Sequence, residues 1–210
     1  MFKNLVQKRF LKCTAFLIFF LLFLLFSTVF AGDIGGGDSP QAVFKAAQAA
    51  GAEKDFAVLT SLVAPSEQAM LAFGTDMAVG MFVEFYEGEK AEALKKKYQE
   101  IQDKYEIKTE NEDEGEKLHV TQDTPQEVID AHMRKRATKL YGQVDAVKYV
   151  PDLMGIIVNM PEMAEQSFFP QEELSELKIE GDLATGKAGD KEITFIHEDD
   201  RWYLAADIMN

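Results

Sequence analysis

Hydrophobic and polar residues alternate near the end of the chain, in the stretch KEITFIHEDDRWYLAADI that begins at Lys191. A period of two is typical of a strand with one buried face. If Asp199 and Asp200 form a two-residue loop, the two halves pair as a hairpin with Phe195 opposite Leu204. Aspartate tolerates the left-handed backbone that such tight loops require. The pattern therefore predicts an antiparallel hairpin in this register.

The same register brings the strongly apolar positions of both strands to one face. The other opposed pairs are Glu198 with Arg201, His197 with Trp202, and Ile193 with Ala206. A slip of one residue would scatter these apolar side chains over both faces, so their agreement favours the register. Ile196 and Tyr203 then lie on the second face, which we expect to be partly covered.

A third strand is predicted upstream, in the stretch LKIEGDLATGKAGD, which ends in a turn at Gly189 and Asp190. A two-residue loop there would place Leu183 opposite Ile196. A loop one residue longer would reverse the faces, and the sequence leaves both registers open. The end of the chain is thus predicted to be a three-stranded antiparallel meander.

A helix is predicted in the stretch SPQAVFKAAQAAGAEKDF near the start. Ser39 is a favourable N-cap, and Pro40 suits the first helical position because it has no backbone N–H. Gly51 is a plausible stop. A shorter helix is expected from Phe56 to Val63.

The next segment, EQAMLAFGTDMAVGMFVEFYE, follows Ser66 as its cap and is apolar on most sides. This composition predicts a buried helix, with Met70, Met77 and Met81 as adaptable core side chains. The alternative is that the helix forms the wall of a pocket for an apolar ligand.

Three further helices complete the middle of the chain. Glu89 to Tyr105 is highly charged and carries a narrow apolar stripe, which suits packing on its own domain or docking on a partner. Thr124 and Glu127 have the spacing of a capping box at the start of the second helix. The third is a short apolar helix before Pro161.

The predicted elements indicate an α+β fold, with helices packed on a curved antiparallel sheet and an enlarged helical middle. We expect a signal peptide at 1–31, a glycine-rich tether at 32–38, and one domain at 39–210. The helical middle of that domain covers 66–160.

The first 31 residues have the order of a secretory signal peptide. Their charged side chains are all basic: Lys3, Lys8, Arg9 and Lys12. An apolar run from Ala15 to Ala31 follows, and Val29 and Ala31 match a small-residue cleavage site. We therefore expect export, to a periplasm or to the outside. The alternative is a membrane anchor formed by residues 13–31, since that run is nearly long enough to span a bilayer.

Composition restricts the chemistry of the exported chain. Its single cysteine, Cys13, belongs to the signal segment, so disulfides, thiol catalysis and cysteine-based metal sites are excluded from the mature chain. Without the four basic residues of 1–31, 18 basic side chains remain against 36 acidic ones. Such an acidic protein is repelled by nucleic acid and by anionic lipids, so we expect neither as a partner.

The acidic stretch ENEDEGEK resembles a calcium-binding loop but lacks one ligand. With Gly115 at the sixth position, Glu110, Glu112 and Glu114 take the first, third and fifth. Thr121 then takes the twelfth, where a bidentate glutamate is required. We predict a solvated acidic loop and no metal site.

No catalytic motif or cofactor motif is present. The three histidines are His119, His132 and His197. None has a second histidine or a cysteine at the spacing of metal ligands. There is no Gly-x-Ser-x-Gly nucleophile motif, P-loop or zinc-protease helix. We predict no cofactor and assign no catalytic residue.

The two ends of the chain resemble the nuclear transport factor 2-like superfamily, which includes the SnoaL-like domains. The resemblance rests on SPQAVFKAAQAAGAEKDF at the start and ITFIHEDDRWYLAADI at the end. It implies a curved antiparallel sheet wrapped on helices to form a cone. Members of the superfamily include isomerases, cyclases, dehydratases and non-catalytic binding modules, so the fold leaves the function open. The stretch from Pro65 to Glu176 is longer and more helical than the family pattern.

We predict an exported, non-enzymatic domain that binds a small apolar ligand or a protein partner. One alternative is an isomerase-type or cyclase-type enzyme that uses acid–base catalysis in the cone, with a buried carboxylate or His197 as base. Another is a lipid carrier on the export side. The candidate residues for a pocket or partner face are Met81, Phe85, Tyr98, His197 and Tyr203.

Overall fold

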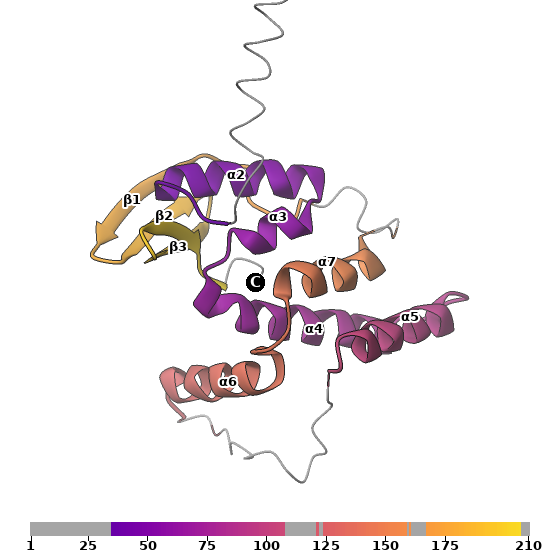
Figure 1. Cartoon of the computed structure of the whole chain (residues 1–210). Helices are drawn as coiled ribbons and strands as arrows, with labels where there is room; N and C mark the ends of the chain where they lie inside the picture. The colour runs from indigo at the N-terminus through magenta and orange to yellow at the C-terminus, as the bar shows by residue number, and fades with distance from the viewer. Residues whose placement is uncertain (1–34, 108–120, 122–123, 159, 161–166, 207–210) are drawn as a thin grey trace, which may run out of the picture. The chain divides into compact units, whose positions relative to one another are not determined.

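The computed structural model describes residues 35–107, 121, 124–158, 160 and 167–206. In this part of the chain six α-helices precede four strands (Figure 1). The helices are α2 (Pro40–Glu53), α3 (Phe56–Ser61), α4 (Gln68–Phe85), α5 (Ala91–Lys104), α6 (Gln126–Tyr141) and α7 (Ala146–Ile157). The strands are β1 (Leu174–Glu180), β2 (Leu183–Ala188), β3 (Lys191–Glu198) and β4 (Arg201–Leu204). The predicted α+β class is confirmed.

The strands form one antiparallel sheet in the order β1-β2-β3-β4. The predicted hairpin register is confirmed, since Phe195 pairs with Leu204 and His197 with Trp202. Asp199 and Asp200 have φ of 49° and 61°, the left-handed values that a two-residue hairpin loop requires.

The expectation of three strands was wrong. The stretch interpreted as one strand is divided into β1 and β2 by a tight turn at Gly181 and Asp182, and Gly181 has φ of 64°. Glycine adopts this conformation without steric cost. The register left open is resolved as well, because Leu183 pairs with Ile196.

The sheet has one covered face and one more open face. The covered face carries Ile193, Phe195 and Leu204, all at most 3% exposed, and α2 packs against the sheet at β4. On the opposite face Leu183 is 54% exposed and Ile196 is half-buried.

Trp202 and Tyr203 differ from the expectation of a buried tryptophan and a more open tyrosine. Trp202 is half-buried, whereas Tyr203 is 7% exposed. The tyrosine ring lies beneath Gly36, where a Cβ atom would come within 2.7 Å of it. The segment before α2 is bound to strand β4, because Gly37 and Trp202 exchange two backbone hydrogen bonds of 2.8 Å.

The start of α2 is as predicted, and its end is not. The Ser39 hydroxyl accepts a hydrogen bond from the Ala42 N–H, and Pro40 is the first helical residue. The helix continues past Gly51 to Glu53 and ends at Lys54, which has φ of 57°. Gly51 instead permits close packing, since a Cβ there would lie 2.7 Å from the Cβ of Phe169.

Two predicted helix caps are absent. The Ser66 hydroxyl bonds to Glu198 rather than to the start of α4, which follows a short 3₁₀ turn over Pro65–Glu67. The Thr124 hydroxyl accepts a hydrogen bond from the backbone N–H of Thr121, so the predicted capping box does not form. Both side chains bond outside the helix whose start they were expected to cap.

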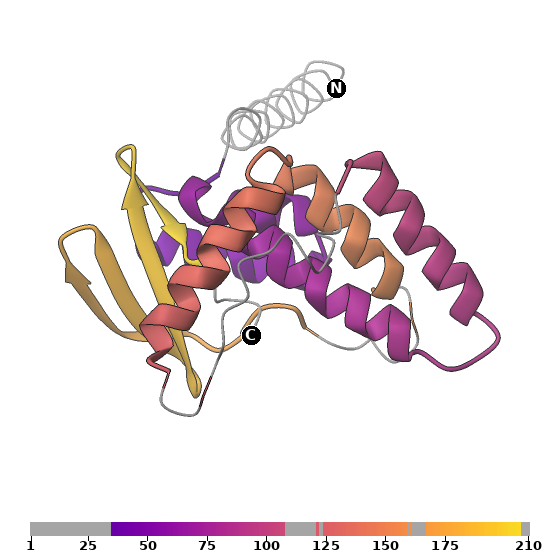
Figure 2. The ribbon, with the colours of Figure 1, turned by 90° about the horizontal axis from the view of Figure 1, so that it is seen from below.

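Helix α4 is the centre of the helical group. It packs against α5, α6 and α7, with α7 above it and α6 below it in Figure 1. Figure 2 shows α5 and α7 on one side of α4. Met77 and Met81 are 45% and 59% exposed, so the expectation that they fill the core was wrong. The residues of α4 that face the other helices include Phe73, Asp76 and Val83.

Several predictions lie outside the described residues. These are the signal peptide at 1–31, the alternative anchor at 13–31, and the acidic loop containing Glu110, Glu112 and Glu114. The tether is described only from Gly35 onward. In the part of the chain that the structure describes, none of the helices combines the length and the hydrophobicity needed to cross a bilayer.

Candidate functional site

A buried carboxylate joins the four helices of the helical group. Asp76 of α4 is 9% exposed and accepts hydrogen bonds from three other helices. Its Oδ1 accepts from Tyr98 Oη at 2.9 Å and Gln102 Nε2 at 2.5 Å, both from α5, and from Tyr149 Oη of α7 at 2.8 Å. Its Oδ2 accepts from Tyr141 Oη of α6 at 2.5 Å. We call these five residues the Asp76 cluster.

The tyrosines of the Asp76 cluster are held neutral. Burial raises the pKa of Tyr98 far above its ordinary value, and the neighbouring Asp76 carboxylate raises it further. The pKa values of Tyr141 and Tyr149 are raised in the same way, again mainly by burial. Because a neutral phenol donates its proton, all three hydroxyls act as hydrogen-bond donors to the carboxylate.

The Asp76 cluster has the features of a structural site. A buried charge requires hydrogen-bonding partners, and four donors supply them here. Gly80 allows Tyr98 to approach, because a Cβ there would lie 2.8 Å from the Tyr98 hydroxyl oxygen. None of the five residues lines the cleft described next.

A cleft of about 1260 Å³ lies beside the open face of the sheet. Its walls come from α4, α6, α7, the segment 167–172 and strands β2 and β3. The larger apolar side chains of the lining are Met70, Leu71, Val79, Met154, Ile157, Phe168, Phe169, Leu183 and Ile196. Leu183 is the most exposed of them, so the open face of the sheet supplies apolar surface to the cleft.

Charged and polar residues also line the cleft, among them Asp130, Arg134, Glu172, Asp190 and Lys191. Glu67, 7% exposed, forms an ion pair with Arg134 of α6, whose side chain is 54% exposed. Thr75 also lines the cleft, and its buried hydroxyl has no hydrogen-bond partner. The cleft therefore combines an apolar wall with a paired cation and a hydroxyl, as sites for amphiphilic small molecules do.

The five residues predicted from the sequence are not gathered at one site. Met81 and Phe85 lie on an exposed face of α4, at 59% and 76% exposure, and neither lines the cleft. Tyr98 belongs to the Asp76 cluster. His197 stacks on Trp202 with ring centroids 4.9 Å apart, and Tyr203 is buried at the edge of the sheet.

The sequence contained a signal for Asp76 that our prediction missed. Asp76 is the only charged residue between Glu67 and Glu84 in an otherwise apolar helix. An isolated charge in such a segment must find partners elsewhere in the fold. The cleft residues carry no comparable signal, because they come from segments far apart in the chain.

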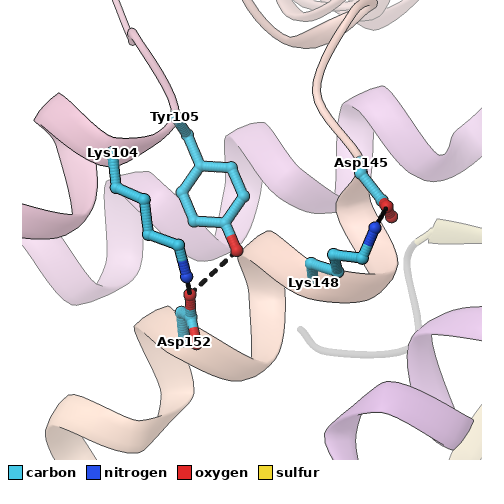
Figure 3. A network of polar contacts seen from close by, with 5 residues as sticks. All are labelled: Lys104, Tyr105, Asp145, Lys148 and Asp152. Atoms are coloured by element: carbon cyan, nitrogen blue, oxygen red, sulfur yellow. Dashed lines mark hydrogen bonds and ion pairs between the residues drawn. The ribbon is translucent and has the colours of Figure 1, made fainter.

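A second polar network links α5 to α7 at the surface (Figure 3). Asp152 accepts hydrogen bonds from Lys104 Nζ at 2.7 Å and from Tyr105 Oη at 2.8 Å. Partial burial acts to raise the pKa of Asp152, but the two hydrogen bonds outweigh it, and the pKa lies below its ordinary value. Nearby, Lys148 and Asp145 form an ion pair of 2.6 Å within the first turn of α7. These contacts stabilise the packing of α5 against α7, and none of the five residues lines the cleft.

The described residues contain no group of three histidine, cysteine, aspartate or glutamate side chains placed to hold a metal ion. Comparisons with models of protein families, with curated proteins and with solved structures gave no match in any of the three. The function is therefore argued from the site alone.

Proposed function

We propose that this protein is an exported, non-enzymatic binding domain that holds a small apolar or amphiphilic molecule in the cleft beside the sheet. The observation that carries the proposal is the apolar lining of that cleft, about 1260 Å³ in volume, including the half-exposed Leu183. Ordinary ligand pockets have about 300–1,000 Å³. The larger volume favours an elongated ligand, such as a molecule with a single alkyl chain.

The polar residues in the lining of the cleft suit the polar end of such a molecule. Arg134 is already paired with Glu67, so it offers hydrogen-bond donors without an uncompensated charge. The two ends of the chain resemble a superfamily with many non-catalytic binding modules, which supports the same function and remains a prediction. Export rests on the segment 1–31 and is part of the proposal.

The Asp76 cluster gives no support to an acid–base enzyme. A general base must reach the proton that it removes from a bound substrate. Asp76 is surrounded by four donors from its own chain and does not line the cleft. We therefore assign it to stability and propose no catalytic residue.

The test is a titration of the purified protein with the fluorescent probe 1-anilinonaphthalene-8-sulfonate, followed by displacement with dodecanoate. We expect saturable binding at one site. Leu183→Ser should weaken probe binding about fivefold, because burying the exposed half of a leucine contributes about 1 kcal/mol. The substitution lies at an exposed position next to a turn, so the fold should be retained.

Ile179→Ser is the matched control. Ile179 of β1 is 55% exposed, against 54% for Leu183, and it does not line the cleft. It pairs with Ala184, which lies on the covered face together with Phe195. Probe affinity should be unchanged in this variant. Equal weakening in both variants, or no saturable binding by the parent protein, would contradict the proposal.

A further inference from the structure

One buried hydroxyl in the described part of the chain lacks a hydrogen-bond partner. Thr75 of α4 is 6% exposed, and its Oγ1 is the one buried side-chain nitrogen or oxygen atom there that is left unpaired. Thr60, also buried in a helix, shows the usual arrangement, since its hydroxyl donates to the carbonyl of Phe56 at 2.6 Å. The equivalent bond from Thr75 to the carbonyl of Leu71 is not formed. Such unpaired groups are rare in native proteins and require an explanation.

Thr75 lies in the wall of the cleft. The residues of α4 around it in the lining are Leu71, Gly74, Ala78 and Val79, and none of them has a polar side chain. A Cβ added to Gly74 would meet nothing within 4 Å, so there is open space beside Thr75. The hydroxyl itself is enclosed, but threonine in a helix has two accessible rotamers. A rotation about χ1 can therefore present the hydroxyl to a molecule in the cleft.

We propose that Thr75 forms a hydrogen bond with the polar group of the ligand, and that this group is an uncharged hydroxyl, ester or amide on an alkyl chain. The inference rests on the proposed function and specifies the class of ligand. The threonine hydroxyl can donate to a carbonyl oxygen or accept from an alcohol. Because water is excluded at this position, a ligand that supplies the missing partner is favoured over one that does not.

Charge restricts the polar group that can lie at Thr75. The adjacent residue, Asp76, is a buried carboxylate, so an anionic group would be repelled. Arg134 is paired with Glu67, which lies about 12 Å from Thr75 along α4 at 1.5 Å per residue. Burying a charge without a counterion costs far more than burying an uncharged group that forms a hydrogen bond. An uncharged group therefore fits this position best.

A carboxylate amphiphile would use a different polar contact in the same cleft. The head group of dodecanoate would lie at Arg134, whose guanidinium can donate to a carboxylate. Its affinity should therefore not depend on the hydroxyl of Thr75. This difference allows the contribution of Thr75 to be separated from that of the apolar wall.

The test compares octan-1-ol with 1-chlorooctane, which has the same chain but a much weaker hydrogen-bonding group. Both are measured by displacement of 1-anilinonaphthalene-8-sulfonate, whose own dissociation constant is determined for each variant. Thr75→Val should weaken the binding of octan-1-ol about fivefold, the contribution of one uncharged hydrogen bond. The binding of 1-chlorooctane and of dodecanoate should be unchanged.

Two further variants serve as controls. Thr75→Ser keeps the hydroxyl, so the ratio of the two octyl affinities should stay within about twofold of that of the parent protein, well short of the loss of one hydrogen bond. Arg134→Gln should weaken dodecanoate and leave octan-1-ol unchanged. Thr75→Val keeps the shape of the side chain and removes an unpaired buried hydroxyl, so its melting temperature should stay equal or rise.

Three results would overturn the proposal. The first is an unchanged affinity of Thr75→Val for octan-1-ol, and the second is an equal loss for octan-1-ol and 1-chlorooctane. The third is a clearly lower melting temperature of Thr75→Val, which would show that the hydroxyl is paired within the protein. If neither octyl compound nor dodecanoate displaces the probe from the parent protein, the proposed function itself fails, and this inference fails with it.

Discussion

Replacing Asp76 with alanine tests the role of the buried cluster. The substitution removes the only acceptor shared by Tyr98, Gln102, Tyr141 and Tyr149. Gln102 and Tyr149 can still bond to each other, because their polar atoms already lie 2.9 Å apart. The hydroxyls of Tyr98 and Tyr141 lose their acceptor inside the helical group.

The expected loss follows from those two hydroxyls. A buried polar group left without a partner costs about 1–3 kcal/mol. Two such groups give about 2–6 kcal/mol, and relief from burying the carboxylate offsets part of this. We therefore expect Asp76→Ala to lower the free energy of unfolding by about 2–4 kcal/mol, a large share of the roughly 5–15 kcal/mol that stabilises a domain.

Asp76→Asn should cost clearly less. The side-chain oxygen of asparagine can keep the three donors that bond to Oδ1. Its amide can donate to Tyr141, whose hydroxyl can turn and accept. We expect a loss of about 1–2 kcal/mol, because hydrogen bonds to a charged acceptor become neutral ones.

The assay is urea unfolding followed by far-UV circular dichroism, with linear extrapolation to water. Tyr98→Phe, which removes one donor alone, serves as a comparison. In the double variant with Asp76→Ala, Tyr98→Phe should lower the free energy of unfolding little further, because the acceptor of its hydrogen bond is already gone. If Asp76→Ala costs less than about 1 kcal/mol, or if Asp76→Asn costs as much as alanine, the structural role is refuted.

Two further predictions concern the same cluster. The pKa values of Tyr98, Tyr141 and Tyr149 are raised in the folded protein, so the cluster's stabilisation is complete below the unfolded value of about 10 and is lost as pH rises above it. In an alkaline titration followed by the ultraviolet absorbance of tyrosinate, these three should ionise only together with unfolding; their ionisation while the circular dichroism stays native would contradict this. Gly80→Ala should destabilise the protein although alanine favours helix, because its Cβ would lie 2.8 Å from the Tyr98 hydroxyl oxygen. Thermal melts check this, and a stabilised Gly80→Ala variant would show that Tyr98 is not held there.

The hairpin was predictable because its determinants are local. The alternation around Phe195 and the two aspartates of the loop lie within a few residues of each other, so period and turn chemistry together set the register. The same reasoning overlooked the turn at Gly181, since the stretch around it continues in both directions with residues that suit a strand. A single glycine and aspartate in such a stretch fit either a turn or a continuous strand.

The exposure of α4 was not predictable from its composition. A helix that is apolar on most sides is usually buried, and its sequence alone does not distinguish core positions from surface positions. Val83 is 3% exposed, whereas Met81, two residues earlier, is 59% exposed. The difference arises from the neighbours, because α5, α6 and α7 cover only part of the α4 surface.

The cleft could not be predicted for a related reason. Its walls come from segments more than 100 residues apart in the sequence, such as those of Met70 and Leu183. Only the fold brings them together, and neither residue is unusual in its local context. The Asp76 cluster was predictable in part. The isolated charge of Asp76 is visible in the sequence, whereas its hydrogen-bonding partners on the other helices are not.

The central claim, that the cleft holds an apolar ligand, is tested most directly by methyl NMR of protein labelled with ¹³C at its methionine methyl groups. Met70 and Met154 line the cleft, whereas Met77 and Met81 do not. On titration with dodecanoate, the signals of Met70 and Met154 should shift together and saturate, and Leu183→Ser should weaken both responses. Shifts confined to Met77 and Met81, or no saturable shift at any methionine, would contradict the claim.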